Sequence, residues 1–158
     1  MLKYLNTQVT FAEVPDEITL CINITGCKNG CKNCHSSYLA QDIGKPLNKS
    51  SLSELIEGNK GVSCVSFMGG DNDAIHLVAL ASWVKTHTNL KVAWYSGRQE
   101  LAGIVARQLQ WLDFIKLGPY KEEFGPLNSR TTNQRFYKVS GRELVDITSK
   151  FWKHETEN

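Results

Sequence analysis

The chain has 158 residues, and its 18 basic and 16 acidic side chains give a formal net charge of +2. Hydrophobic residues make up 41% and charged residues 22%, which excludes a disordered chain, a collagen-like repeat and a coiled coil. A chain of this length fits one domain, so we expect residues 1–158 to form a single domain.

Two classes of partner are not expected. Basic side chains are interspersed with acidic ones and form no run that could follow a phosphate backbone, so nucleic acid is not an expected partner. The longest apolar stretch, residues 75–84, is about half of the roughly 20 residues that a membrane helix needs. The first residues show no apolar signal core, and we therefore expect a cytoplasmic protein without a membrane partner.

Short apolar or β-branched runs alternate with segments of helical pattern along the first three quarters of the chain. Buried strands are predicted at residues 18–24, 64–68, 92–95 and 114–117. Helices are predicted between them, the first opening with a capping box at residues 51–54, the second over 73–87 and the third over 99–110. In the second helix, Ile75, Val78, Leu80 and Val84 are expected to pack on a sheet.

The pattern changes after residue 117. Gly-Pro pairs at 118–119 and 125–126 indicate loops, and residues 135–139 and 143–147 alternate around Ser140-Gly141 like a β-hairpin. Strands that alternate with helices imply right-handed βαβ units. A complete eight-stranded β/α barrel needs about 200 residues or more. The predicted fold is therefore α/β: a partial, open β/α barrel with a mainly parallel sheet and a C-terminal hairpin.

Three cysteines directly after the first predicted strand are the strongest chemical feature. Cys27, Cys31 and Cys34 are spaced four and three positions apart, so a short loop can wrap their thiolates around one inorganic centre. A [4Fe-4S] cluster is usually held by four cysteines. With three, one iron stays open to an outside ligand, as a catalytic cluster requires. Cys21 and Cys64 fall inside predicted strands and are expected to be buried core thiols.

The alternative is a structural zinc site made by the same three cysteines with His35 as fourth ligand. The protein would then be a non-catalytic, zinc-binding interaction module. Zinc ribbons and fingers normally bring a second ligand pair from a separate knuckle, and the sequence has no second CxxC or HxxxH.

The CxxxCxxC spacing after a first strand, followed by a glycine-rich strand end, resembles the radical S-adenosylmethionine enzymes. The resemblance implies that the open iron chelates S-adenosylmethionine, which an electron from the cluster cleaves to methionine and a 5′-deoxyadenosyl radical. It also implies that Gly69, Gly70 and Asp71 hold the methionine amino group, with Asp71 in place of the usual glutamate. Taken alone, Gly-Gly-Asp-Asn is also ordinary turn chemistry.

Other cofactor contacts follow from the same resemblance. Asn33 stands where the family commonly has an aromatic residue, and the backbone of Asn33, Cys34 and His35 is expected to contact the nucleoside. His35 is a candidate for stacking on the adenine, or else a solvent-facing loop histidine. Ser96, at the end of the third strand, is a candidate for a ribose or carboxylate contact, or else the N-cap of the third helix.

Within that family, residues 94–97, 116–120 and 127–135 resemble the activating proteins of anaerobic ribonucleoside-triphosphate reductase. The resemblance implies an oxidoreductase that generates a glycyl radical on the reductase, its protein substrate, and that takes electrons from a donor such as a flavodoxin. An open barrel would leave a wide mouth for a polypeptide. Activation of another glycyl-radical enzyme, of the formate-lyase type, is the alternative within the family.

The last loop contributes residues without a chemical role of their own. Asn128, Arg130, Asn133 and Arg135 are expected to line the mouth or to fix the final hairpin, and turn or strand-start hydrogen bonding is an equal alternative for the stretch 133–135. Abstraction of a hydrogen atom needs no general acid or base, so no catalytic side chain is expected.

Overall fold

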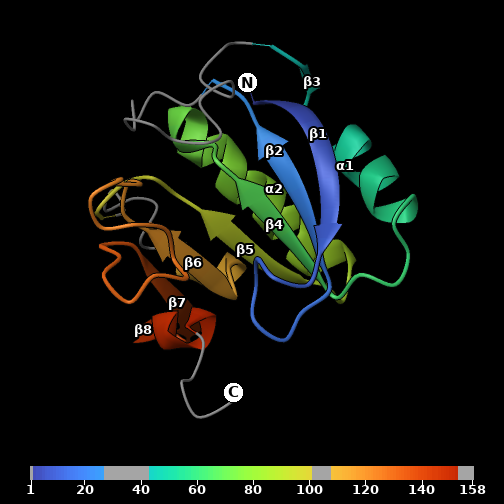
Figure 1. The fold of residues 1–158 in the computed structure, drawn as a ribbon. Helices are drawn as coiled ribbons and strands as arrows, with labels where there is room; N and C mark the ends of the chain where they lie inside the picture. Colours follow the sequence, from blue (N-terminus) through green and yellow to red (C-terminus); the bar gives the residue numbers. More distant parts are fainter. Residues whose placement is uncertain (1, 27–42, 101–107, 153–158) are drawn as a thin grey trace.

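The structure is a computed structural model that describes residues 2–26, 43–100 and 108–152. In this part of the chain one sheet has the strand order β3-β1-β2-β4-β5-β6-β7-β8 (Figure 1). The strands are β1 (Lys3–Thr10), β2 (Thr19–Ile24), β3 (Lys45–Pro46), β4 (Cys64–Met68), β5 (Lys91–Tyr95), β6 (Phe114–Leu117), β7 (Arg135–Ser140) and β8 (Glu143–Asp146). The helices are α1 (Lys49–Glu57) and α2 (Ala74–His87), with the short 3-10 turns η2 (Asp71–Asp73), η3 (Leu109–Trp111) and η4 (Thr148–Phe151).

The sheet is mixed. Its middle strands β2, β4, β5 and β6 pair in parallel, whereas β1 and β3 on one side and β7 and β8 on the other pair antiparallel. The four strands predicted from apolar runs are these middle strands, and they are confirmed to within one residue at each end. The predicted hairpin is also confirmed, and Gly141 takes a φ of 63° in its turn. β1 and β3 were not predicted.

Helix α1 begins earlier than predicted, and its capping box is not at residues 51–54. Asn48 is the N-cap: its side chain accepts a hydrogen bond from Ser51 N at 2.9 Å, and its own amide donates to Ser51 Oγ at 2.9 Å. Asparagine is at least as good an N-cap as serine, so the helix starts at the first suitable residue. The third predicted helix falls mainly on residues 101–107, outside the described residues; the described residues 109–111 form η3.

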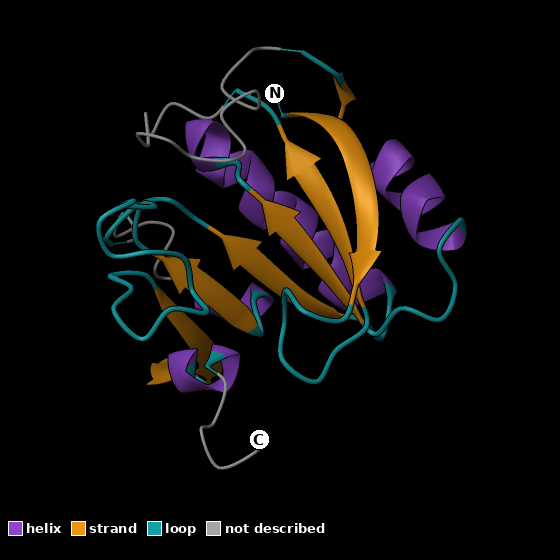
Figure 2. Ribbon diagram, viewed as in Figure 1, coloured by secondary structure: helices purple, strands orange, loops and turns teal. Residues whose placement is uncertain are grey.

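Helix α2 covers one face of the sheet (Figure 2). Its buried side chains meet alternate residues of the parallel strands in the main core, which includes Leu20, Ile22, Val65, Phe67 and Trp94. The predicted packing face is correct for Val78, Leu80 and Val84, but Ile75 is 66% exposed because it lies on the outer side of the first turn. No helix in the described ranges has the length and apolar character needed to cross a bilayer.

The opposite face of the sheet has a different character. Here the parallel strands present Cys21, Asn23, Cys64, Ser66 and Met68, together with Ala93, Tyr95, Phe114 and Lys116 from the later strands, because side chains alternate between faces. At the amino ends of the strands this face is covered by the loop between β1 and β2, whose Val14 is fully buried with Cys64, Ala93 and Phe114. We call it the inner face.

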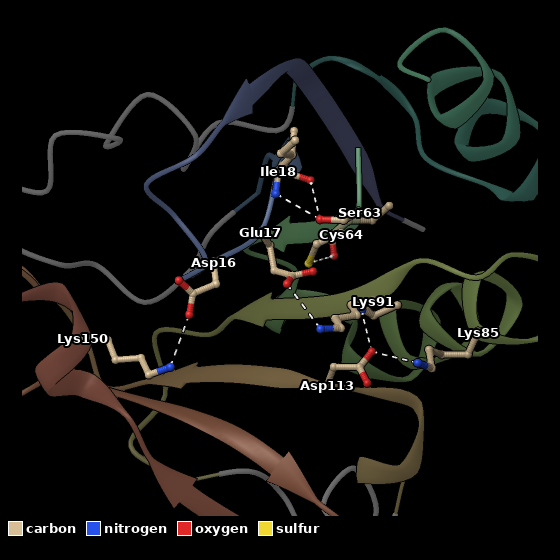
Figure 3. A network of polar contacts seen from close by, with 11 residues as sticks. Asp16, Glu17, Ile18, Ser63, Cys64, Lys85, Lys91, Asp113 and Lys150 are labelled. Atoms are coloured by element: carbon tan, nitrogen blue, oxygen red, sulfur yellow. Dashed lines mark hydrogen bonds and ion pairs between the residues drawn. The ribbon is translucent and has the colours of Figure 1, made fainter. Parts of the chain in front are cut away.

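Ion pairs hold the amino-terminal edge of the sheet together (Figure 3). The pairs are Lys85 with Asp113 at 2.9 Å, Lys91 with Glu17 at 3.3 Å and Lys150 with Asp16 at 3.4 Å. Asp113 also accepts a hydrogen bond from Val92 N at 2.8 Å, which ties the start of β6 to the start of β5. These contacts link the loops at the amino ends of the strands. The loops at the carboxyl ends form the candidate site described below.

The two faces of α2 give a matched stability test. Leu77 is fully buried and Ile75 is 66% exposed on the same helix. We expect Leu77→Ala to lower the free energy of unfolding by about 2–5 kcal/mol, because it leaves a cavity in the core. We expect Ile75→Ala to change it by less than about 0.5 kcal/mol. Urea unfolding followed by circular dichroism measures both, and equal effects would contradict the packing described for α2.

Candidate functional site at the carboxyl edge of the sheet

The carboxyl ends of β2, β4, β5 and β6 meet at one edge, where open α/β sheets bind ligands. Of the predicted site residues, Cys27, Cys31, Cys34, Asn33 and His35 lie outside the described residues. Gly26, directly before Cys27, is described and follows β2 at this edge. Gly69, Gly70 and Asp71 follow β4, and Ser96 follows β5.

The Gly-Gly-Asp turn lies against the end of β2. A Cβ placed on Gly69 would come within 3.3 Å of the carbonyl oxygen of Ile24, and a Cβ placed on Gly26 within 3.2 Å of Asn72 Nδ2. The chain therefore enters the cysteine segment beside residues 69–72. Gly26 and the turn at residues 69–72, about 40 residues apart in the sequence, are therefore neighbours at this edge.

Gly69 and Gly70 are required by the backbone as well as by space. Their φ angles are 112° and 103°, which side chains rarely adopt. The turn is attached to β5 on both sides of Gly69, whose carbonyl accepts from Trp94 Nε1 at 2.8 Å and whose amide donates to Tyr95 O at 3.0 Å. A Cβ placed on Gly70 would collide with Leu77 Cδ1, so glycine at this position lets the turn pack closely on α2.

Asp71 and Ser96, predicted as separate cofactor contacts, bond to each other. Ser96 Oγ donates to Asp71 Oδ1 at 2.6 Å, and Gly97 N donates to Asp71 Oδ2 at 2.9 Å. The Asp71 side chain is only 4% exposed, and Arg98 Nε lies 3.9 Å from Oδ1. Ser96 Oγ also accepts from Arg98 N at 3.1 Å, which is the bond that an N-cap serine makes.

The inner face adds residues that the sequence analysis missed. Asn23, Met68, Tyr95 and Lys116 are opposite one another in register across the four parallel strands, close to their carboxyl ends. Lys116 is 7% exposed; its Nζ donates to Gly118 O at 3.0 Å and lies 5.7 Å from the centre of the Tyr95 ring. Polar residues at alternate positions of otherwise apolar strands are the feature that could have revealed this row.

The expected residues of the last loop do not gather at one point. Asn128 and Arg130 line a cavity of about 280 Å³ with Phe151 and Trp152. Asn133 Nδ2 donates to Pro119 O at 3.0 Å, which holds the loop after β6. Arg135 Nη1 lies 3.7 Å from Asp146 Oδ2, across the β7–β8 hairpin. The position of Arg135 is compatible with the expectation that it fixes the hairpin.

Cys21 and Cys64 are buried on the inner face, as predicted. Burial raises the pKa of both thiols from 9.0 to about 12, and the charge of Glu13 adds to the shift for Cys21 while that of Glu17 adds to it for Cys64. The pKa of Tyr95 is likewise raised well above its usual value by burial and then by Glu13, whose backbone oxygen accepts a hydrogen bond from the Tyr95 hydroxyl. These groups stay neutral at physiological pH and form part of the core.

The chain was compared with known protein families. The family model of the 4Fe-4S single cluster domain matches residues 18–139, which is most of the chain. The match includes all three cysteines of the CxxxCxxC motif and extends from β2 to β7. No curated protein and no solved structure matches the chain.

The raised thiol pKa values predict selective alkylation. At pH 8.5 iodoacetamide is expected to leave Cys21 and Cys64 unmodified in the folded protein and to modify them in urea, since a buried protonated thiol is a poor nucleophile. Peptide mapping by mass spectrometry locates the label. Labelling of either cysteine at the same rate in both states would contradict the burial.

The same pKa shifts predict how stability depends on pH. Because only the unfolded chain loses these thiol protons near pH 9, the free energy of unfolding should fall progressively as pH rises from about 9 toward 12.

Proposed function

Because the chain belongs to the family of 4Fe-4S single cluster domains, we propose that it is a radical S-adenosylmethionine enzyme that activates a glycyl-radical reductase. The observation that carries the proposal is the proximity of Gly26, the residue before Cys27, to the Gly69–Asn72 turn, where a Cβ placed on Gly26 would lie 3.2 Å from Asn72 Nδ2. A cluster held by the cysteines that follow Gly26 would then be bound beside this turn.

Cys27, Cys31 and Cys34 are the proposed ligands of a [4Fe-4S] cluster. The donor set fits this group, because three thiolates within eight residues suit iron and leave one iron without a cysteine. When bound, the cluster and S-adenosylmethionine together supply reductive cleavage of the sulfonium and the radical that removes a hydrogen atom from the partner. Lys28 and Lys32 lie between the cysteines in the sequence and would offset negative charge at the cluster.

The chain's own contribution is to position the cofactor. Gly69, Gly70, Asp71 and Ser96 form one bonded unit at the proposed S-adenosylmethionine site, and Asn33, Cys34 and His35 are proposed to contact its nucleoside. The fit is supported by the position of this unit at the carboxyl ends of the parallel strands, where open α/β sheets bind ligands. No side chain has to move a proton.

The proposed protein substrate is anaerobic ribonucleoside-triphosphate reductase, which would receive the glycyl radical, and a donor such as a flavodoxin would supply the electron. We propose that residues 1–158 form one radical S-adenosylmethionine domain, and that its sheet is the open wall of a partial β/α barrel with the inner face toward the substrate. Asn23 and Lys116 bring polar groups to the carboxyl end of that face, where a polypeptide segment would have to enter.

A pair of cysteine variants tests the cluster. Protein purified without oxygen should be brown and contain about four irons per chain. Cys31→Ala is expected to lose most of this iron and its visible absorption, and to release no 5′-deoxyadenosine with reductant and S-adenosylmethionine. Cys21→Ala removes a buried thiol that is not a proposed ligand and should retain both. A colourless protein with one zinc per chain would instead support the zinc-binding module.

Electron spin resonance tests the partner. The reduced protein, mixed anaerobically with S-adenosylmethionine and the reductase, is expected to give the doublet of a glycyl radical, and a reductase variant with its radical glycine replaced by alanine should give none. A signal obtained only with an enzyme of the formate-lyase type would overturn the choice of the reductase as substrate. It would leave the proposed cluster chemistry in place.

A further inference from the structure

The carboxylate of Asp71 connects two loops at the candidate site. It belongs to the turn after β4, and both of its oxygens accept hydrogen bonds from the loop after β5, one from Ser96 Oγ and one from Gly97 N. We call this set of two bonds the Asp71 bridge. Because the Asp71 side chain is only 4% exposed, a contact that replaced these bonds would leave polar groups buried without partners.

The length of the side chain matters for this arrangement. Glutamate, which the resemblance expects here, has one more methylene group and would carry the carboxylate further from its own backbone. Aspartate keeps the charge close to the turn, where the hydroxyl of Ser96 meets one oxygen at 2.6 Å. A short bond from a hydroxyl to a buried carboxylate is among the strong hydrogen bonds of proteins.

The bridge works together with the bonds that fix Gly69. Trp94 Nε1 and Tyr95 O hold the carbonyl and the amide of Gly69, and the Asp71 bridge holds the other end of the same turn. The main chain of Gly69 and Gly70 is thus fixed to β5 at both ends. Removing the bridge would weaken the attachment of the turn at Asp71, where Arg98 Nη2 also donates to Asp71 O at 3.4 Å, and would leave the Gly69 bonds intact.

On these grounds we propose that Asp71 is a positioning residue, which acts on the cofactor through the main chain of Gly69, Gly70 and Gly97 and not by direct contact with the methionine amino group. This inference depends on the proposed function, since it concerns how S-adenosylmethionine is held. Ser96 has the same positioning role, because its hydroxyl donates its one hydrogen bond to Asp71.

Direct contact and positioning predict opposite outcomes for a longer carboxylate. If Asp71 bound the amino group, Asp71→Glu would restore the usual family residue and keep the affinity, and Ser96→Ala would have little effect. If Asp71 is the bridge, Asp71→Glu, Asp71→Ala and Ser96→Ala should each weaken S-adenosylmethionine binding by about tenfold, the scale of one hydrogen bond to a charged group. The double variant Asp71→Ala/Ser96→Ala should be no weaker than Asp71→Ala alone, because both changes break one unit.

The test uses the anaerobically reconstituted full chain and two readouts. Isothermal titration calorimetry with S-adenosylmethionine gives the affinities, and hydrogen exchange by mass spectrometry on the peptide that contains Gly97 reports the bridge without any cofactor. Exchange of the Gly97 amide should accelerate in Asp71→Ala and Asp71→Glu. Asp73→Asn is the matched control: it removes a carboxylate from the same turn but keeps the N-cap oxygen that accepts from His76 N, so both readouts should stay as in the wild type.

The outcomes separate this inference from the proposed function. Wild-type protein that has a cluster but does not bind S-adenosylmethionine would overturn the proposed function, and the cofactor role of Asp71 with it. Wild-type binding that is retained in Asp71→Glu, or single variants with additive effects, would overturn the positioning role alone.

Discussion

The parallel pairing of β2, β4, β5 and β6 is the constraint on which the candidate site depends. Asn23, Met68, Tyr95 and Lys116 are matched in register, so the four strands end at the same level and the loops that follow them meet. A slip of one residue in any pair would turn the polar side chains of the inner face toward α2 and the apolar ones away from it. The register of the strands therefore determines both which side chains pack beneath α2 and which loops meet at the carboxyl edge of the sheet.

The parallel strands could be predicted because they carry apolar or β-branched runs, as expected for strands covered on both faces. β1 could not, because it pairs with β2 near the side of the sheet and mixes exposed polar and apolar residues such as Asn6, Gln8 and Val9. Its place is decided by pairing with a distant segment, which no local pattern encodes. The predicted start of α1 was wrong because two possible capping boxes overlap in the sequence. The helix uses the earlier one, Asn48 with Ser51, and not Ser51 with Glu54.

The candidate site shows the same division. The glycines at 69 and 70 and the serine at 96 could be placed at strand ends from the sequence, since turn residues mark where strands stop. The bond between Asp71 and Ser96 could not, because it joins residues 25 positions apart and depends on the distance between adjacent strands. The sequence predicted a ligand contact for Asp71, and for Ser96 either a ligand contact or an N-cap. It did not predict that the two side chains bond to each other.

The contrast between the two faces of the sheet explains why the polar edge can exist. Helix α2 and the apolar residues beneath it bury the main core on one face, and burial of this kind supplies most of the stability of a small domain. The inner face is closed by Val14 and its apolar neighbours only toward the amino ends of the strands, where ion pairs also hold the edge. Toward the carboxyl ends it has Asn23 and Lys116, whose polar groups would lose their hydrogen-bond partners beneath α2. The stabilising apolar contacts thus lie beneath α2 and at the amino ends of the strands, whereas the polar residues lie at the carboxyl ends. Gly26, the residue before Cys27, follows β2 at this carboxyl edge.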